Sequence, residues 1–147
     1  MIDKLTTAFR DGLELPAPAV EWLIRLWIAT QFLDDVADDT PIPRADMDRA
    51  MWTLLVGLPS SGFYRAHTTR LSGAVEDALL QWKASDNAER EGNATPSSFT
   101  WRASYYNVVL TVVSICHSPQ VAMECAHKVL GLYGETLEDY LKEFNHA

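Results

Sequence analysis

The stretch from Pro18 to Asp38 restricts the fold more than any other part of the chain, because it combines helical spacing with apolar residues on nearly every side. Its large apolar side chains are Trp22, Leu23, Leu26, Trp27 and Leu33. A helix that is apolar all round is usually buried among neighbouring elements. Polar residues interrupt the run before it reaches the ~20 apolar residues that a bilayer-spanning helix needs. We therefore expect a core helix at the centre of its domain.

Helical periodicity also dominates the rest of the chain, whereas the alternation typical of strands is almost missing. Proline, glycine and capping residues separate the expected helices. They cover about residues 2–12, 18–38, 44–56, 63–91, 97–117, 119–130 and 137–144. No linker is long enough to separate domains. The sequence predicts an all-α fold in which residues 1–147 form a compact single-domain bundle of about six to seven helices around the central helix at about 18–38.

Residue types in the later helices predict where these helices end and what they bury. Gly92 is expected to end the fourth helix, and Ser97 or Ser98 to cap the fifth. The segment 92–98 is polar and contains few apolar residues, which makes it the best candidate for a mobile loop. All five tryptophans have core-like spacing within expected helices, so we expect them to pack inside. They are Trp22, Trp27, Trp52, Trp82 and Trp101.

The chain is acidic, with 20 Asp and Glu against 12 Lys and Arg and a net charge of -8. This charge repels phosphate backbones, so direct nucleic-acid binding is not expected. It would attract a basic protein surface and raise the rate of association with it. Secretion and membrane insertion are not expected either. Cys116 and Cys125 are too few for a disulfide framework and are expected to be free thiols in a reducing compartment.

Four aspartates, Asp34, Asp35, Asp38 and Asp39, lie at the C-terminal end of the apolar helix and form what we call the aspartate cluster. The helix dipole favours cations at this end, by about 0.3–1 kcal/mol each. Two pairs in the cluster are also i,i+4 neighbours, whose repulsion costs roughly 0.2–0.5 kcal/mol per pair. A metal ion, a basic partner, internal Lys or Arg, or fraying into water could each compensate. The cluster is therefore the candidate binding site.

Three interpretations of the aspartate cluster remain open: a solvated helix end, an ion-pair site with arginine, and a metal site. Arg102 is the candidate charge partner, because it lies on an otherwise apolar helix where a buried guanidinium needs a carboxylate. Arg25, Arg65 and Arg70 are further candidates for the same role. The sequence does not choose among these interpretations.

Asp34, Asp35 and Asp38 match the Asp-Asp-x-x-Asp spacing with which isoprenoid synthases hold magnesium against a substrate diphosphate. Positions i and i+4 share a helix face, so Asp34 and Asp38 could present hard oxygen ligands together. Those larger helical enzymes carry a second metal motif, and this chain has no convincing counterpart. Magnesium is therefore expected only under the metal interpretation, and otherwise no cofactor is expected.

Several segments together resemble a group of small all-helical proteins encoded by tailed bacteriophages and prophages. The resemblance covers roughly residues 20–110 and rests on Leu33-Asp34-Asp35-Val36-Ala37-Asp38, Met51-Trp52 through Leu58-Pro59, Phe63-Tyr64-Arg65-Ala66-His67, Trp82 and Arg102. It implies a viral or prophage origin and action in the bacterial cytoplasm or in the virion. It implies no particular activity.

Three functions are compatible with these observations. The first is a non-enzymatic accessory protein, an adaptor or inhibitor that binds a basic protein surface. The second is a magnesium-dependent enzyme acting on phosphate or diphosphate esters through Asp34, Asp35 and Asp38. The third is a structural virion component. No glycine-rich phosphate loop or nucleophile elbow is present in the sequence, so a non-enzymatic function is favoured.

Overall fold

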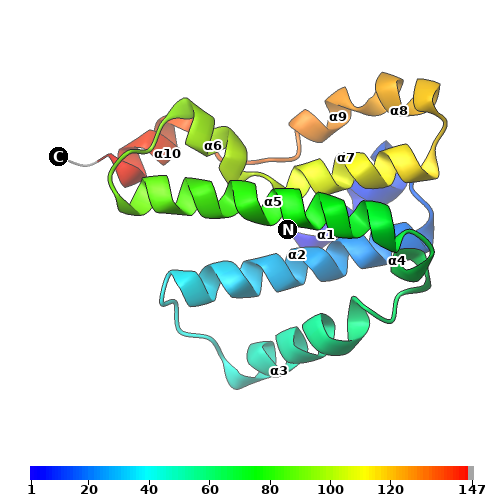
Figure 1. Ribbon diagram of the computed structural model, residues 1–147, viewed down its shortest axis with the longest axis horizontal. Helices are drawn as coiled ribbons and strands as arrows, with labels where there is room; N and C mark the ends of the chain where they lie inside the picture. Colours follow the sequence, from blue (N-terminus) through cyan, green and yellow to red (C-terminus); the bar gives the residue numbers. More distant parts are fainter. Residues whose placement is uncertain (146–147) are drawn as a thin grey trace. The chain divides into compact units, whose positions relative to one another are not determined.

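A computed structural model describes residues 1–145, and every regular element in that range is a helix (Figure 1). The all-α prediction is therefore confirmed. The chain divides into two compact units, Met1–Thr68 and Thr69–Ala147. No sequence signal marks this boundary, because it falls inside the expected fourth helix, away from proline and glycine.

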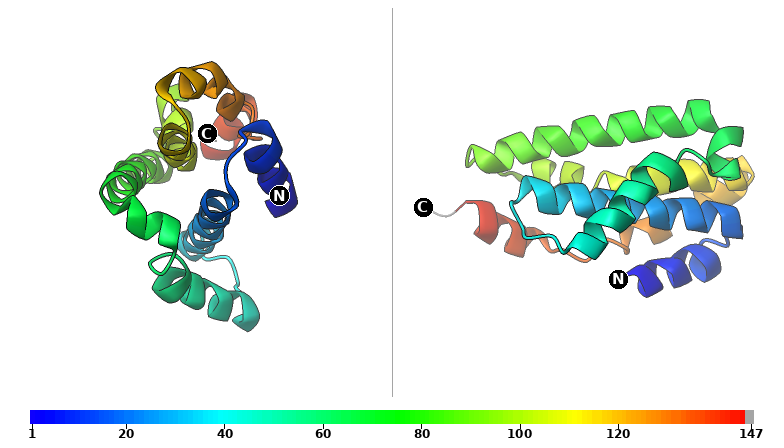
Figure 2. Two further views of the ribbon diagram at one scale, coloured as in Figure 1. Left: turned by 90° about the vertical axis from the view of Figure 1, so that its right-hand side faces the viewer. Right: turned by 90° about the horizontal axis from the view of Figure 1, so that it is seen from below.

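The first unit is built around one long helix, α2 (Ala17–Ala37). The other elements are α1 (Ile2–Thr7), the π-helix η1 (Ala8–Gly12), α3 (Arg44–Trp52), the π-helix η2 (Thr53–Gly57) and α4 (Gly62–Ala66). All five contact α2, as expected of a central apolar helix. In two views α3 runs back along α2 after the connection that follows α2 (Figures 1 and 2). The buried residues of α2 are Ala19, Val20, Trp22, Leu23, Leu26 and Ala29.

Backbone chemistry explains where α2 begins and ends. Pro16 is the N-cap, and the proline that follows lies in the first turn, where its missing N–H costs no hydrogen bond. At the other end, the Asp39 N–H donates to the Val36 carbonyl at 3.2 Å and the Thr40 N–H to the Asp35 carbonyl at 2.9 Å. Asp39 has a φ of 55°, in the left-handed region. This is a Schellman motif with aspartate where glycine is usual.

The second unit consists of α5 (Thr68–Arg90), α6 (Pro96–Arg102), α7 (Tyr105–Cys116), α8 (Pro119–Cys125), α9 (His127–Leu130) and α10 (Leu137–Phe144). α7 runs back along α5, since Asn107 donates to Gln81 and Arg70 donates to Ser114 at 3.0 Å. The Ser104 hydroxyl donates to the Ala78 carbonyl between the same two helices at 2.7 Å. The inner face of α7 is apolar and buried; its members are Val108, Val109, Val112 and Val113.

Gly92 ends α5 as predicted, with a φ of 74° and a second Schellman motif. The predicted cap of the next helix was wrong by two or three residues. The N-cap is Thr95, whose hydroxyl accepts from the Ser98 N–H, while the Ser98 hydroxyl accepts from the Thr95 N–H. Pro96 then takes the first helical position. Residues 96–98, expected in a loop, therefore belong to α6, because a reciprocal capping box can use serine in place of Glu or Gln.

Three other expectations need correction. The expected helix at 63–91 is interrupted at His67, whose φ of -128° is not helical, and the helix at 97–117 is interrupted at Ala103 and Ser104. Next to the first break, the Thr68 hydroxyl donates to the Tyr64 carbonyl at 2.8 Å, a local bond that competes with the helix ladder. The tryptophan expectation also fails in part, since Trp52 and Trp101 are exposed.

Candidate functional site

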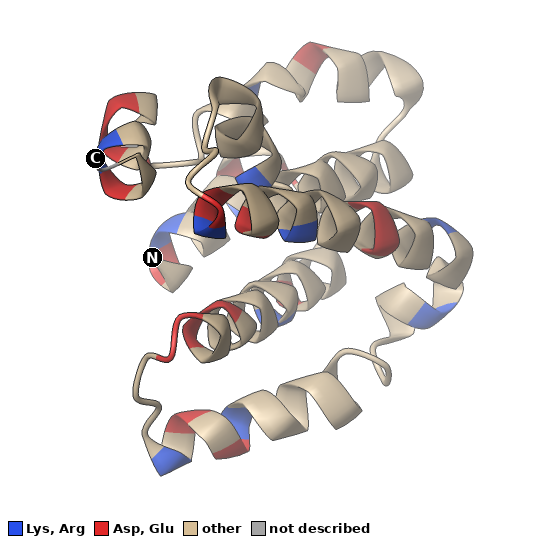
Figure 3. Ribbon diagram, turned by 60° about the vertical axis from the view of Figure 1, so that its left-hand side comes forward, with Lys and Arg blue, Asp and Glu red and all other residues tan. Residues whose placement is uncertain are grey.

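The aspartate cluster occupies the last turn of α2 and the residues that follow it, where Figure 3 shows the acidic positions in red (Figure 3). Asp35, Asp38 and Asp39 are exposed, and Asp34 is half-buried. Within residues 1–145, none of the three exposed aspartates forms an ion pair. These three carboxylates therefore lie at the surface without an ionic partner among the described residues, and the choice between a solvated, an ion-paired and a metal-bound cluster stays a prediction.

Three of the four arginines considered as charge partners, all except Arg65, have other side-chain contacts. Arg25 donates to the Gly57 carbonyl at 3.4 Å, and Arg70 donates to the Ser114 hydroxyl. Arg102 forms ion pairs with Glu89 and Glu135, at 3.4 and 3.3 Å. A contact between Arg102 and the aspartate cluster would join the two units, and it stays a prediction.

One hollow of the first unit lies between α2 and α3, beside the aspartate cluster. Its volume is about 200 Å³. Its apolar lining comes from both helices and from the connection between them, and its polar lining consists of Asp35, Asp46 and Arg49. The apolar members are Ile28, Phe32, Pro41, Ile42, Pro43 and Ala50. The sequence pattern did not reveal this hollow, because its lining residues lie on two helices whose packing angle cannot be read from spacing.

Within the hollow's lining, Arg49 forms an ion pair with Asp46 at 3.1 Å, one helical turn away on α3. These two charges largely neutralise each other. Asp35 thus contributes the uncompensated charge of the lining, and Asp38 and Asp39 add negative charge at the same end of α2. A cation with an apolar stem could contact both a carboxylate and the apolar lining at this position.

Large apolar side chains are exposed close in sequence to these charges. Leu33 and Val36, which flank Asp34 and Asp35, are 48% and 50% exposed. On α3 and η2, Trp52 and Leu55 are 66% and 73% exposed, and Met51 is exposed beside them. Tryptophan is enriched among the residues that dominate binding energy at protein interfaces. Exposed apolar side chains therefore flank Asp34 and Asp35 at the end of α2, and further ones are exposed on α3 and η2.

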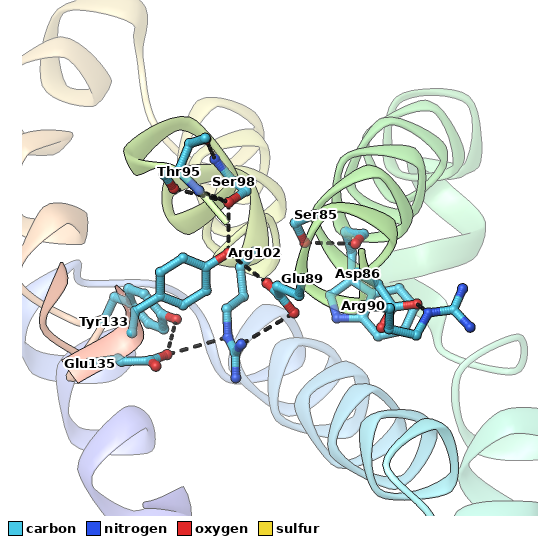
Figure 4. A network of polar contacts seen from close by, with 11 residues as sticks. Ser85, Asp86, Glu89, Arg90, Thr95, Ser98, Arg102, Tyr133 and Glu135 are labelled. Atoms are coloured by element: carbon cyan, nitrogen blue, oxygen red, sulfur yellow. Dashed lines mark hydrogen bonds and ion pairs between the residues drawn. The ribbon is translucent and has the colours of Figure 1, made fainter. Parts of the chain in front are cut away.

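The second unit contains a polar network centred on Arg102, which Figure 4 shows from close by (Figure 4). Besides its two ion pairs, the Arg102 guanidinium lies over the rings of Tyr140 and Phe144, 5.4 and 5.0 Å from their centroids. The Tyr140 hydroxyl donates to Glu89 at 2.9 Å and contacts the Ser98 hydroxyl at 2.7 Å. These contacts fasten α10 to α5 and α6.

Burial shifts the acid–base properties of this network. It raises the pKa of Glu89, although the hydrogen bond from Tyr140 and the charge of Arg102 act in the opposite direction. Burial also raises the pKa of Tyr140 to about 12. The pKa of Tyr133 is raised by burial and by its hydrogen bond of 2.6 Å to Glu135. The polar groups of this network have partners inside the unit, which is typical of a structural network.

The magnesium site expected from Asp34, Asp35 and Asp38 has no further ligands grouped around it. Among residues 1–145, no three His, Cys, Asp or Glu side chains lie so that they could hold a metal ion together. In the same residues, no helix has the length and apolar character needed to cross a membrane. Cys116 and Cys125 are free thiols and half-buried.

No protein-family model matches the chain, and no curated protein or solved structure is significantly similar to it. The resemblance to phage-encoded helical proteins therefore stays a prediction.

The sequence did not indicate several residues of the hollow and of the Arg102 network. Phe32, Ile42 and Asp46 line the hollow, and Glu89 and Tyr140 hold Arg102. The Pro41-Ile42-Pro43 run offered a partial signal, because it places an apolar side chain in the connection next to the aspartate cluster, but it does not indicate the part of the lining that α3 supplies. Glu89 carried no comparable signal, since it looks like any other acid on a helix.

Proposed function

We propose that the protein acts by binding a basic surface of another protein, as an adaptor or inhibitor, and that it does so through the end of α2. The observation that carries this proposal is the joint exposure of Asp35, Asp38 and Asp39 with Leu33 and Val36 on one helix end. Exposed apolar groups gain free energy when a partner covers them, by about 25 cal/mol per Å² of apolar area. The carboxylates favour a partner of opposite charge and raise the rate of association with it.

The electrostatic cost of the aspartate cluster supports the same proposal. Exposed carboxylates at a helix C-terminus lose stability to the dipole and to each other. A basic partner would remove both costs on binding, and the chain's net charge of -8 would add long-range attraction. If the resemblance to phage-encoded proteins holds, the partner is a protein in the bacterial cytoplasm. Finding the chain in purified virus particles would instead favour a structural virion component.

The experiment is affinity capture from a lysate of the source cells with three baits at low and high KCl. The first bait is the parent chain, and the second carries Asp35→Asn, Asp38→Asn and Asp39→Asn. The third carries Glu76→Gln, Asp77→Asn and Glu91→Gln, which removes three exposed carboxylates on and next to α5 and lowers the net negative charge equally. Equal net charge separates a local binding site from general acidity.

We expect the parent and the α5 variant to retain a basic protein that the α2 variant loses and that high salt releases, because screening weakens exposed charge contacts. Retention of the same proteins by all three baits would contradict the proposal. A magnesium or manganese titration of the parent, followed by tryptophan fluorescence and melting temperature, tests the enzyme alternative. A response that the α2 variant lacks would favour that alternative.

A further inference from the structure

The size of the hollow between α2 and α3 limits what it can bind. Small-molecule sites usually measure about 300–1,000 Å³. At about 200 Å³ the hollow is smaller than this range. An occupant that fits is a single side chain presented by another protein. This conclusion extends the binding function proposed above, since the hollow borders the acidic end of α2.

The lining of the hollow favours a side chain that has both an apolar stem and a charged head. Ile28, Phe32 and Ile42 offer apolar surface from α2 and from the connection to α3. This surface suits an aliphatic stem, which a long basic side chain can bury while its head stays in water. The half-buried ring of Phe32 can also attract a cation placed over its face.

The charges around the hollow favour a cation over an anion. Its cationic lining residue, Arg49, is paired with Asp46. The C-terminus of α2, where the helix dipole favours cations, also borders the connection that lines the hollow. The exposed carboxylate of Asp35 then determines the sign of the charge that the hollow prefers.

We propose that the hollow binds one arginine side chain of the basic partner. The stem packs on Ile28 and Ile42, and the guanidinium lies between the Phe32 ring and the Asp35 carboxylate. Arginine suits this position better than lysine, because its planar head can stack on a ring and bond a carboxylate through two N–H groups at once. Arginines that anchor in such pockets are common among the dominant residues of protein interfaces.

The test is a titration of the full-length, ¹⁵N-labelled chain with three blocked tripeptides, followed by NMR. The tripeptides are identical except for a central arginine, lysine or citrulline; citrulline keeps the stem and removes the charge. We expect the arginine peptide to bind at millimolar concentration and to shift signals from residues 28–50. The lysine peptide should bind more weakly, and the citrulline peptide should produce no saturable shift.

Matched variants locate the site of binding. Asp35→Asn should lower the affinity for the arginine peptide by about threefold to fivefold, which is the effect of losing one partly exposed charge pair. Asp38→Asn removes the same charge from the same helix end but outside the hollow, and it should change the affinity by less than twofold. Phe32→Leu should also weaken binding, because it removes the ring. Thermal melting of each variant confirms that it is folded.

Equal weakening by Asp35→Asn and Asp38→Asn would overturn this inference, because it would show attraction to the acidic end as a whole. Equal binding of the citrulline peptide would overturn it as well, and so would the lack of any saturable shift. None of these results would affect capture of a basic protein by the parent bait. The experiments can therefore disprove arginine binding in the hollow without disproving the proposed binding function.

Discussion

Only about a quarter of the Arg102 side chain is exposed, so its charge needs compensation from neighbouring groups. Two carboxylates, from Glu89 and Glu135, neutralise it, and the rings of Tyr140 and Phe144 cover its face. A buried ion pair is weak evidence of stabilisation in itself, because desolvation offsets most of the attraction. Removing one partner is a different matter, since the remaining charges then lie half-buried without compensation.

Arg102→Met should therefore lower the free energy of unfolding by about 1–3 kcal/mol, measured by urea denaturation. The methionine keeps much of the apolar stem, so the loss reports mainly on the unpaired carboxylates of Glu89 and Glu135. Arg90→Met is the control, because Arg90 is exposed and pairs with Asp86 at the surface of α5. Its cost should stay below about 1 kcal/mol. Equal effects of the two changes would show that the Arg102 contacts contribute no more than a surface pair.

Glu89 should make stability depend on pH. Burial raises its pKa above the ordinary value of 4.5, so the folded state binds this proton more tightly than the unfolded state does. The contribution of Glu89 to the free energy of unfolding is then largest below pH 4.5, falls as the pH rises through the raised pKa, and stays low above it. Glu89→Gln, which imitates the protonated form, should remove this fall.

The measurement compares urea midpoints of the parent and of Glu89→Gln at several pH values from 4 to 8. The difference between the two proteins isolates Glu89 from the other carboxyl groups. Glu138→Gln, on the exposed side of α10, is the matched control for the loss of one surface charge. A difference between parent and Glu89→Gln that does not change with pH would contradict the assigned burial effect.

Two helices end with the same backbone motif but with different residues in its left-handed position. Gly92 ends α5, and Asp39 ends α2, with φ values of 74° and 55°. A residue with a Cβ pays roughly 1–2 kcal/mol in that conformation, although aspartate tolerates it better than most. The dipole adds a cost for the negative charge. The end of α2 is thus less stable than a glycine in the same motif would make it.

Asp39→Gly should raise the free energy of unfolding by roughly 0.5–1 kcal/mol, because it relieves both the left-handed strain and the unfavourable charge. The greater freedom of glycine in the unfolded chain limits the gain. Asp39→Ala removes the same charge and keeps a Cβ, so it should be less stable than Asp39→Gly. Urea denaturation of the two variants gives the comparison. The opposite order would show that the backbone conformation does not limit stability here.

At the level of helices, much could be read from the sequence because helical hydrogen bonds are local. Proline and glycine mark the start of α2 and the end of α5, and the predicted final helix matches α10, Leu137–Phe144. The breaks at His67 and Ala103 were missed, because no proline or glycine marks them. Serine in the Thr95 capping box was missed because the usual pattern places Glu or Gln there.

The charge of the complete chain should make its stability depend on salt. A net charge of -8 opposes compaction through repulsion, which salt screens. Raising KCl from 10 to 150 mM should therefore increase the melting temperature by about 1–3 °C. The gain should be smaller in the Asp35, Asp38 and Asp39 to Asn variant, which has less charge. A melting temperature that falls with KCl would show that screened ion pairs outweigh the repulsion.

The amino-acid sequence was enough to establish an all-α chain, the central place of α2 in its unit and the acidic end of that helix. These properties depend on spacing, capping and composition, which act over a few residues. Packing decided the rest. Tyr140 meets Glu89 across 51 residues, and Asp35 borders a hollow whose other side belongs to α3. Such contacts depend on how whole helices lie against each other, and no local pattern in the chain specifies that geometry.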